Sequence, residues 1–309
     1  MSILIVSPGK KLNRWKDALN AVDPSVAVFL PEEVKDPLDI TFALSWNHPK
    51  KMFRKYPNLK CISSFGAGVD HLLSDTQIPK HVEIVRIIDP LLSADMFEFA
   101  LAVVMKHLRK LTRYTRYQEA SIWKKHEYLR IKDIRIGIMG TGMIGHHVAS
   151  ELQRVGFRVS GWNRTGGQPT SYDKYYGTVQ LNDFLKVSDV LICLLPLTRQ
   201  TRGIINYSLL KALPADAYVI NFGRGAHVNE RDLISAIDEG HISGAHLDVF
   251  EEEPLPENHL FWQQPGIDIT PHVASLTDPD SIAPQVMENY HRSREGMPLK
   301  NLVSRDLGY

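Results

Sequence analysis

The sequence carries almost no net charge, because its 36 lysines and arginines are balanced by 35 aspartates and glutamates. Proteins that bind nucleic acid or a membrane surface normally have an excess of basic residues, so we expect neither kind of partner. The chain also has no apolar run near the roughly 20 residues that span a bilayer. Its longest dense apolar stretch, residues 97–105, is interrupted by Glu98.

Cysteine is scarce, and the two cysteines, Cys61 and Cys193, lie far apart in apolar stretches. Buried thiols that form no disulfide are typical of a reducing compartment. No basic segment precedes the apolar residues at positions 3–6, which we expect to form a strand rather than part of a signal peptide. The sequence has no repeats and no Pro/Gly/Ser-rich linker. These features predict a cytoplasmic globular protein, and we expect no metal site.

The 309 residues are enough for two domains, and short apolar stretches alternate with helical patterns along the chain. This alternation predicts parallel sheets covered by helices on both faces. A long helix is expected to begin at Ser93, a suitable N-cap, and to continue to Leu111. Strands are expected at residues 3–7, 27–30, 40–46, 60–64, 82–87, 134–139, 157–162, 190–195, 218–222, 246–249 and 267–270, and further helices at 13–21 and 279–294.

Residues 140–145 read Gly-Thr-Gly-Met-Ile-Gly, between a predicted strand and a predicted amphipathic helix. In the G-x-G-x-x-G pattern the first glycine permits a tight turn, the second lets the backbone approach a pyrophosphate, and the third lets the helix pack closely on the strand. The N–H groups of the helix's first turn would face the phosphates. Since glycines also occur in ordinary turns, the flanking strand and helix decide in favour of nucleotide binding.

The end of the second strand indicates which nucleotide binds. NAD-binding proteins of this fold usually place Asp or Glu at this strand end, about 20 residues after the glycine turn, where it binds the ribose 2′-hydroxyl. Here that position holds Asn163, followed by Arg164 and Thr165. No carboxylate would repel a 2′-phosphate, and the Arg164 guanidinium is placed to pair with one. We therefore expect NADP, with NAD less favoured; the alternative is that Arg164 is a solvated loop residue.

Three ionisable side chains stand near predicted strand exits, where ligands bind in open α/β sheets. They are Arg224 between two glycines, Glu253 at the end of an acidic run, and His272 shortly after a strand. These residue types suit reduction of a 2-keto acid by a nicotinamide: histidine protonates the developing alkoxide, a carboxylate orients the imidazole, and arginine binds the substrate carboxylate. Each also has an ordinary interpretation, as a surface ion pair, a solvated charge run or a loop histidine.

A second glycine turn, residues 65–70 (Phe-Gly-Ala-Gly-Val-Asp), follows a predicted strand in the first part of the chain. Its backbone N–H groups are candidates for binding the substrate carboxylate. A plain loop is the alternative.

These motifs, in this order, resemble the D-2-hydroxyacid dehydrogenase family. The resemblance covers nearly the whole chain and is strongest to the bacterial glyoxylate/hydroxypyruvate reductase A branch. It implies NADPH-dependent reduction of small 2-keto acids such as glyoxylate and hydroxypyruvate. It rests on residues 66–70, 140–145, 195–198, 221–225, 247–256 and 270–274.

The resemblance also assigns roles to residues. It implies that Arg224, Glu253 and His272 are catalytic, with Glu253 chosen among three glutamates because it precedes a proline. It implies that Asp248 accepts a hydrogen bond from the nicotinamide amide, and that the Trp46 indole favours small substrates. The predicted cofactor site consists of Gly140, Gly142, Met143, Ile144, Gly145, Asn163, Arg164, Thr165, Leu195, Pro196, Phe222 and Asp248, and the predicted substrate site of Trp46, Ala67, Gly68, Arg224 and His272.

The fold that the resemblance implies is α/β, with two doubly wound parallel-sheet domains. A Rossmann cofactor domain, residues 99–282, would be inserted into a flavodoxin-like substrate domain, residues 1–98 and 283–309, with the active site in the cleft. Homodimers are usual in the family. In some relatives a tryptophan from the partner lines the substrate pocket, and Trp123 is the candidate for that role here.

Two other functions stay open at this stage. One is a dehydrogenase of a larger D-2-hydroxyacid, in which Trp46 is merely structural. The other is a dinucleotide-sensing binding protein without turnover. The presence of Arg224, Glu253 and His272 favours an enzyme over a sensor.

Overall fold

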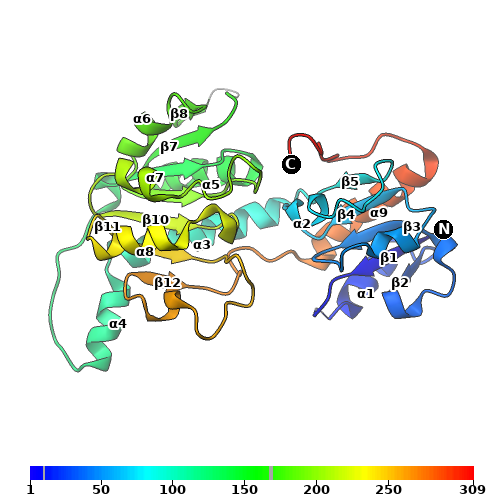
Figure 1. The fold of residues 1–309 in the computed structure, drawn as a ribbon, viewed down its shortest axis with the longest axis horizontal. Coiled ribbons are helices and arrows are strands. Elements are labelled where there is room, and N and C mark those ends of the chain that lie inside the picture. Colours follow the sequence, from blue (N-terminus) through cyan, green and yellow to red (C-terminus); the bar gives the residue numbers. More distant parts are fainter. Residues whose placement is uncertain (10, 167–169) are drawn as a thin grey trace. The chain divides into compact units, whose positions relative to one another are not determined.

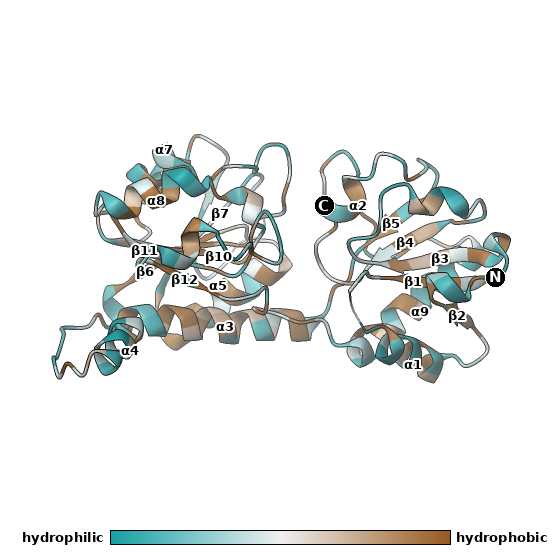
Figure 2. Cartoon of the chain, turned by 60° about the horizontal axis from the view of Figure 1, so that its bottom comes forward, coloured by the Kyte–Doolittle hydropathy of each residue, from teal (hydrophilic) through white to brown (hydrophobic). Residues whose placement is uncertain are grey.

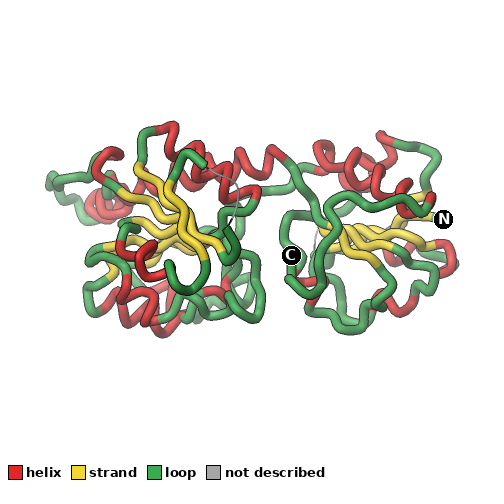
Figure 3. Tube along the Cα trace, turned by 90° about the horizontal axis from the view of Figure 1, so that it is seen from above, coloured by secondary structure: helices red, strands yellow, loops and turns green. Residues whose placement is uncertain are grey.

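The computed structural model describes residues 1–9, 11–166 and 170–309, and it contains two parallel sheets (Figure 1). The backbone divides into two compact units: unit 1 is Met1–Leu91 with Thr277–Tyr309, and unit 2 is Leu92–Leu276. In each unit helices lie on both faces of the sheet (Figure 3). The predicted α/β class with two parallel-sheet domains is confirmed. None of the helices in the described part of the chain combines the length and hydropathy that crossing a bilayer requires.

Unit 1 is built on a five-stranded sheet with the order β2-β1-β3-β4-β5, which is the flavodoxin-like order. Every residue of its three central strands is buried, as expected of a parallel sheet covered on both faces. The last helix of the chain packs against the first helix and against β3, where the rings of Phe42 and Tyr290 lie 6.1 Å apart. The elements are β1 (Ser2–Val6), α1 (Asn13–Val22), β2 (Ala27–Phe29), β3 (Ile40–Ser45), β4 (Cys61–Ser64), α2 (Asp70–Leu73), β5 (Glu83–Val85) and α9 (Pro279–Glu295).

Unit 2 is built on a seven-stranded sheet with the order β12-β11-β10-β9-β6-β7-β8. Counted from β6, this is the Rossmann order extended by one strand. Its elements are α3 (Pro90–Leu108), α4 (Leu111–Glu119), β6 (Arg135–Met139), α5 (Met143–Val155), β7 (Arg158–Asn163), β8 (Asp173–Tyr176), α6 (Leu181–Lys186), β9 (Val190–Cys193), α7 (Tyr207–Ala212), β10 (Ala217–Asn221), α8 (Glu230–Asp238), β11 (Ile242–Leu247) and β12 (Ile267–Ile269). Short 3-10 turns occur at Pro31–Glu33, Pro37–Asp39, Met52–Lys55, Ile131–Asp133, Gly225–His227 and Leu260–Gln263.

Two buried clusters fill the space between the sheet of unit 2 and its helices. One packs α3 and α5 against the sheet, through residues such as Val104, Ile138 and Leu152, and hydrophobic residues predominate along α3 (Figure 2). The other packs α7 and α8, through residues such as Leu209 and Leu233. Full burial of each such side chain stabilises the fold by roughly 1.5–3 kcal/mol, so these layers hold the strand exits in place.

The long helix differs from its prediction at both ends. It begins at Pro90 rather than after Ser93, because Asp89 accepts a hydrogen bond from the Leu91 N–H (3.0 Å) and proline suits the first helical position. It stops at Leu108, and Lys110, with a φ of 56°, separates it from α4. The domain boundaries expected at 98/99 and 282/283 fall inside α3 and α9, respectively.

Candidate active site

Two of the three glycines in the turn after β6 have a steric reason, and the third borders open space. Gly140 has a φ of +99°, and a Cβ there would lie 2.7 Å from the Leu194 carbonyl oxygen. A Cβ on Gly145 would lie 1.8 Å from the Gly140 oxygen, so only glycine lets α5 approach β6. A Cβ on Gly142, the N-cap of α5, would meet no atom within 4 Å. The space beside Gly142 therefore suits a ligand that approaches the backbone closely.

The end of β7 is tied to this turn. The Asn163 Nδ2 donates a hydrogen bond to Thr141 Oγ1 at 2.9 Å. The Asn163 Oδ1 is buried and accepts no hydrogen bond from the described residues. Arg164 and Thr165 follow it and are exposed. These features together fit a dinucleotide. The glycine turn is open, the helix N-terminus can face phosphates, and the ribose hydroxyl groups can donate to the buried Asn163 oxygen.

The other predicted cofactor residues lie at the start of α5 and after β9 and β10. Met143 and Ile144 form the first turn of α5, and Met143 is exposed. Leu195 and Phe222 are buried, whereas Pro196 is exposed. All of these residues sit at the carboxyl edge of the sheet, where this fold binds its ligands. Among residues 1–9, 11–166 and 170–309, no group of three acidic, histidine or cysteine side chains is arranged to hold a metal ion.

Glu253 and His272 are in direct contact. The His272 Nδ1 lies 2.8 Å from Glu253 Oε2, and the other carboxylate oxygen accepts a hydrogen bond from the Phe250 N–H at 3.0 Å. Desolvation, the largest single influence, would raise the pKa of Glu253. The hydrogen bonds from His272 and Phe250, with the charges of His272 and Arg224, outweigh it and lower that pKa. Glu253 is therefore held as a carboxylate beside the imidazole.

The neighbouring Glu251 is engaged elsewhere, since its carboxylate pairs with Arg202 at 2.9 Å. Glu251 and Glu253 are chemically identical, but their positions in the acidic run give them different partners. The choice of Glu253 from its place before a proline agrees with its contact to His272, while its catalytic role stays a prediction.

His272 stands on a strained turn. Its φ of 54° lies in the left-handed region, and its N–H donates to the Asp248 carbonyl oxygen at 2.8 Å. The buried Asp248 carboxylate accepts hydrogen bonds from Thr270 Oγ1 (2.6 Å) and from the N–H groups of Val273 (2.9 Å) and Ala274 (3.0 Å). Asp248 therefore anchors the turn that carries His272, a role that the sequence did not indicate.

Arg224 follows β10 and is the N-cap of the turn Gly225–His227. The Asn221 Nδ2 donates to its carbonyl oxygen at 2.8 Å. A Cβ on Gly225 would lie 1.9 Å from the Phe250 carbonyl carbon, so this turn abuts the backbone that leads to Glu253. The charge of Arg224 lowers the pKa of Glu253, which also indicates that the two side chains lie near each other. The structure thus groups Arg224, Glu253 and His272 within unit 2.

The substrate residues predicted in the first part of the chain also lie together, within unit 1. Trp46 follows β3, and its ring lies 4.5 Å from the ring of His71 at the start of α2. Ala67 and Gly68 are half-buried in the turn after β4, and a Cβ on Gly66 would come within 3.7 Å of the Trp46 indole. The turn after β4 therefore lies beside the tryptophan.

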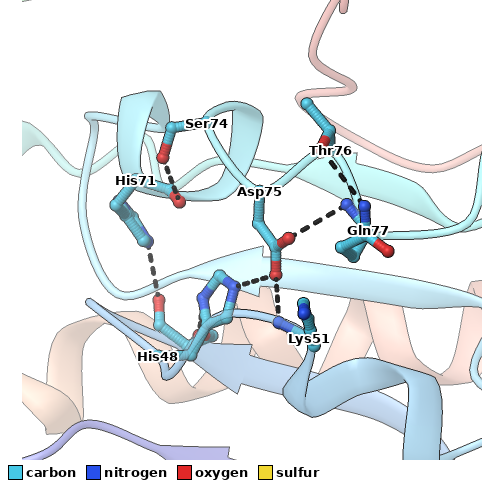
Figure 4. A network of polar contacts seen from close by, with 8 residues as sticks. His48, Lys51, His71, Ser74, Asp75, Thr76 and Gln77 are labelled. Atoms are coloured by element: carbon cyan, nitrogen blue, oxygen red, sulfur yellow. Dashed lines mark hydrogen bonds and ion pairs between the residues drawn. The ribbon is translucent and has the colours of Figure 1, made fainter.

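A polar network supports this part of unit 1 (Figure 4). The buried His48 contacts Ser45 Oγ through Nδ1 and Asp75 Oδ2 through Nε2, both at 3.2 Å. Asp75 also accepts hydrogen bonds from the N–H groups of Lys51 (3.1 Å) and Gln77 (2.9 Å). Sequence reasoning missed His48 and His71; the histidine two residues after Trp46 was the only local signal.

Comparison with known proteins identifies the family. The family model described as "D-isomer specific 2-hydroxyacid dehydrogenase, NAD binding domain" matches residues 101–274. A glyoxylate/hydroxypyruvate reductase A of Photorhabdus laumondii is 42% identical over 273 residues, which is 87% of this chain and 87% of that protein. The predicted resemblance is therefore confirmed.

Two solved structures are similar over the whole chain. A D-isomer specific 2-hydroxyacid dehydrogenase from Xanthobacter autotrophicus, in complex with NADPH and MES, has a TM-score of 0.94 and 37% identity, covering 100% of this chain and 99% of that one. An NADPH-dependent glyoxylate/hydroxypyruvate reductase from Sinorhizobium meliloti, in complex with NADP and sulfate, has a TM-score of 0.92 and 33% identity, covering 100% of both chains. This chain belongs to the D-isomer specific 2-hydroxyacid dehydrogenase family.

Proposed function

We propose that the chain is an NADPH-dependent reductase of small 2-keto acids, converting glyoxylate to glycolate and hydroxypyruvate to D-glycerate. The observation that carries the proposal is the 2.8 Å contact between His272 Nδ1 and Glu253 Oε2. The contact supports the proposal because a carboxylate that orients an imidazole suits proton donation, and the charge of Arg224 acts on the same carboxylate. Relatives named for this activity at 42% and 33% identity support it.

In this proposal Nδ1–H of His272 donates to Glu253, which leaves Nε2–H to face the substrate. A nicotinamide cofactor held at the glycine turn after β6 would supply the hydride that the carbonyl carbon gains. The Nε2 proton passes to the carbonyl oxygen, so that the keto acid gains one hydride and one proton and becomes the 2-hydroxy acid. Arg224 binds the substrate carboxylate, and the anionic Glu253 stabilises the imidazolium before the proton leaves.

Unit 2 is the proposed cofactor domain, with NADPH preferred over NADH. Asn163 stands where a carboxylate would select the ribose 2′-hydroxyl, and Arg164 follows it. The complexes of similar proteins with NADPH and NADP support this choice. We assign the contacts to Gly140, Gly142, Met143, Ile144, Gly145, Asn163, Arg164, Thr165, Leu195, Pro196, Phe222 and Asp248.

Unit 1 is the proposed substrate domain. Its residues Trp46, Ala67 and Gly68 lie together, and the bulk of an indole favours a small substituent on the keto acid. The amides of Ala67 and Gly68 are the proposed donors to the substrate carboxylate.

We also propose a homodimer formed through the segment after α4. After α4 the chain forms a long loop (Figure 1). In this segment Trp123 is 96% exposed, and Ile122, Tyr128 and Leu129 are each nearly half exposed. The segment is held in place, because His126 is hydrogen-bonded to the hydroxyl groups of two tyrosines on α4. An ordered apolar segment of this kind suits a second copy of the chain. Light scattering should show a dimer that Trp123→Glu converts to a monomer.

A cytoplasmic location completes the proposal. Both cysteines are buried and form no disulfide, which fits a reducing compartment.

The test is oxidation of NADPH and NADH with glyoxylate, hydroxypyruvate, pyruvate and a phenyl-substituted keto acid. We expect fast turnover of glyoxylate and hydroxypyruvate with NADPH. Turnover of the phenyl-substituted acid alone would keep the chemistry and remove the small-substrate assignment of Trp46. Tight dinucleotide binding without turnover would replace the reductase with a sensor.

A further inference from the structure

We infer that His227 is a positioning residue that holds the backbone of Arg224 and the segment at Pro196 in register through its two ring nitrogens. The inference deepens the proposed function and rests on it, because it takes Arg224 as the substrate-binding arginine and Pro196 as a cofactor contact. His227 touches neither substrate nor cofactor in this role.

The first ring nitrogen holds the arginine. The Arg224 N–H donates to His227 Nδ1 at 3.0 Å, and the His227 N–H donates back to the Arg224 carbonyl oxygen at 3.1 Å. These two hydrogen bonds close the turn Gly225–His227 on its N-cap. A backbone N–H can only donate, so Nδ1 is an acceptor and the ring proton lies on Nε2.

The second ring nitrogen reaches the neighbouring strand exit. The Nε2 of His227 lies 3.3 Å from the Pro196 carbonyl oxygen, and this is where the proton assigned above is needed. The neutral ring with its proton on Nε2 therefore satisfies both contacts at once. Pro196 follows β9 and Arg224 follows β10, so one side chain links the exits of two adjacent strands.

The position of the ring also explains a glycine. A Cβ on Gly223 would lie 2.8 Å from both Cε1 and Nδ1 of His227 and 3.1 Å from the Leu195 oxygen. Any other residue before Arg224 would push the imidazole away. The side chain of His227 is fully buried, so its alignment is set by packing rather than by solvent.

The two contacts can be separated by two amide side chains. The Oδ1 of asparagine falls near the position of a histidine Nδ1, and the amide nitrogen of glutamine falls near that of Nε2. His227→Asn thus keeps the acceptor for Arg224 and loses the donor to Pro196, whereas His227→Gln does the reverse. We expect His227→Gln to raise the KM for glyoxylate about tenfold and His227→Asn to raise the KM for NADPH about tenfold, each leaving the other KM within about twofold.

The matched controls are His241→Gln and His241→Asn. His241 also lies in unit 2, and its Nε2 contacts the carbonyl oxygen of Leu210 at 3.2 Å. It directly precedes β11, whereas Asp248 of the proposed site directly follows that strand, at its other end. These variants should lower Tm without moving either KM. Equal changes of both KM values in both His227 variants would show that the ring only fills space, and would overturn the inference. Should either His227 variant be recovered poorly, Gly223→Ala displaces the ring by other means and should raise both KM values.

Arg224→Lys separates failure of this inference from failure of the proposed function. If Arg224→Lys raises the KM for glyoxylate and His227→Gln does not, then Arg224 binds substrate and only the role of His227 is wrong. If Arg224→Lys leaves that KM unchanged, then the substrate-binding assignment is wrong and the inference falls with it.

Discussion

Unit 1 and unit 2 each present a glycine turn directly after a buried strand, but the two turns are held in different ways. In unit 2 the backbone itself excludes side chains, since Cβ atoms on Gly140 and Gly145 would collide with carbonyl groups. In unit 1 a Cβ on Gly66 would meet Thr277 and Trp46 only at ordinary contact distances of 3.5 and 3.7 Å. The turn of unit 2 is dictated by steric exclusion, whereas the turn of unit 1 depends on the side chains around it.

The largest difference between the two units should appear in the effect of substitutions on kcat. His272→Ala removes the proposed proton donor and should lower kcat by about 10² to 10⁴ while leaving the dissociation constant for NADPH unchanged. Trp46→Ala in unit 1 should change kcat for glyoxylate far less and should raise the relative activity with the phenyl-substituted acid. Steady-state kinetics and NADPH fluorescence titration measure both. A His272→Ala enzyme with normal turnover and weak NADPH binding would contradict the assignment.

Alanine at the two turns tests the comparison directly. Gly145→Ala should destabilise the fold by about 3 kcal/mol or more and weaken NADPH binding, because the methyl group meets a carbonyl oxygen that cannot move aside. Gly66→Ala should cost less than about 1 kcal/mol. Urea unfolding of the two variants gives the numbers. Similar losses in both would mean that the two turns are under the same steric constraint.

A carboxylate at the end of β7 should affect the cofactor and leave the substrate alone. Asn163→Asp should shift the ratio of kcat/KM for NADPH to that for NADH by about 10- to 100-fold toward NADH, because the carboxylate repels a 2′-phosphate and can bind the 2′-hydroxyl. The KM for glyoxylate should not move. Asn229→Asp, at the N-cap of α8, is the matched control and should leave the ratio unchanged. An unchanged ratio in Asn163→Asp would refute the interpretation of this strand end.

Acid should weaken the fold mainly through unit 2. Desolvation lowers the pKa of His246 to about 4, and it is also the main reason why the pKa of His107 falls to about 4. The pKa of each histidine is near 6.5 in the unfolded chain and about 4 in the folded chain. Between these two pH values the unfolded chain binds protons that the folded chain does not, so the free energy of unfolding decreases as the pH is lowered. At pH 5.5 the loss should be on the order of 1 kcal/mol for each histidine.

Urea unfolding between pH 5 and 7.5 measures this slope. His246→Asn and His107→Phe should each flatten it. His48→Asn in unit 1 should do so less, because Asp75 opposes the desolvation that lowers the pKa of His48. A slope that neither unit 2 variant changes would assign the acid sensitivity to other groups.

Much of the fold was visible in the sequence because buried parallel strands are short apolar runs. The strand β8 was missed, since Asp173–Tyr176 is a polar edge strand with no buried residue to give a pattern. The start of α3 was misplaced because Ser93 looked like a cap, while the proline and aspartate before it gave the better signal. The first error reflects a strand that has no apolar pattern, and the second a choice between two neighbouring start signals.

In the site, too, some residues could be predicted from the sequence and others could not. Glu253 and His272 were chosen from motifs, and the structure places them in contact. The supports were not visible: His227 lies three residues from Arg224, but only the turn Gly225–His227 aims its ring back at the Arg224 N–H. The anchoring of the His272 turn by Asp248 likewise depends on a turn geometry that residue spacing does not encode.

The order in which the ribosome delivers the chain gives the discontinuity of unit 1 a consequence during synthesis. All of unit 2 is encoded in one continuous stretch, and the Ser275 hydroxyl near its end donates to the Leu92 carbonyl oxygen at its start. Unit 1 lacks α9, with Tyr290 packed beside Phe42, until the residues after unit 2 emerge. Because domains generally fold as units during translation, the nascent first 91 residues must wait with an incomplete core while the inserted unit folds ahead of them.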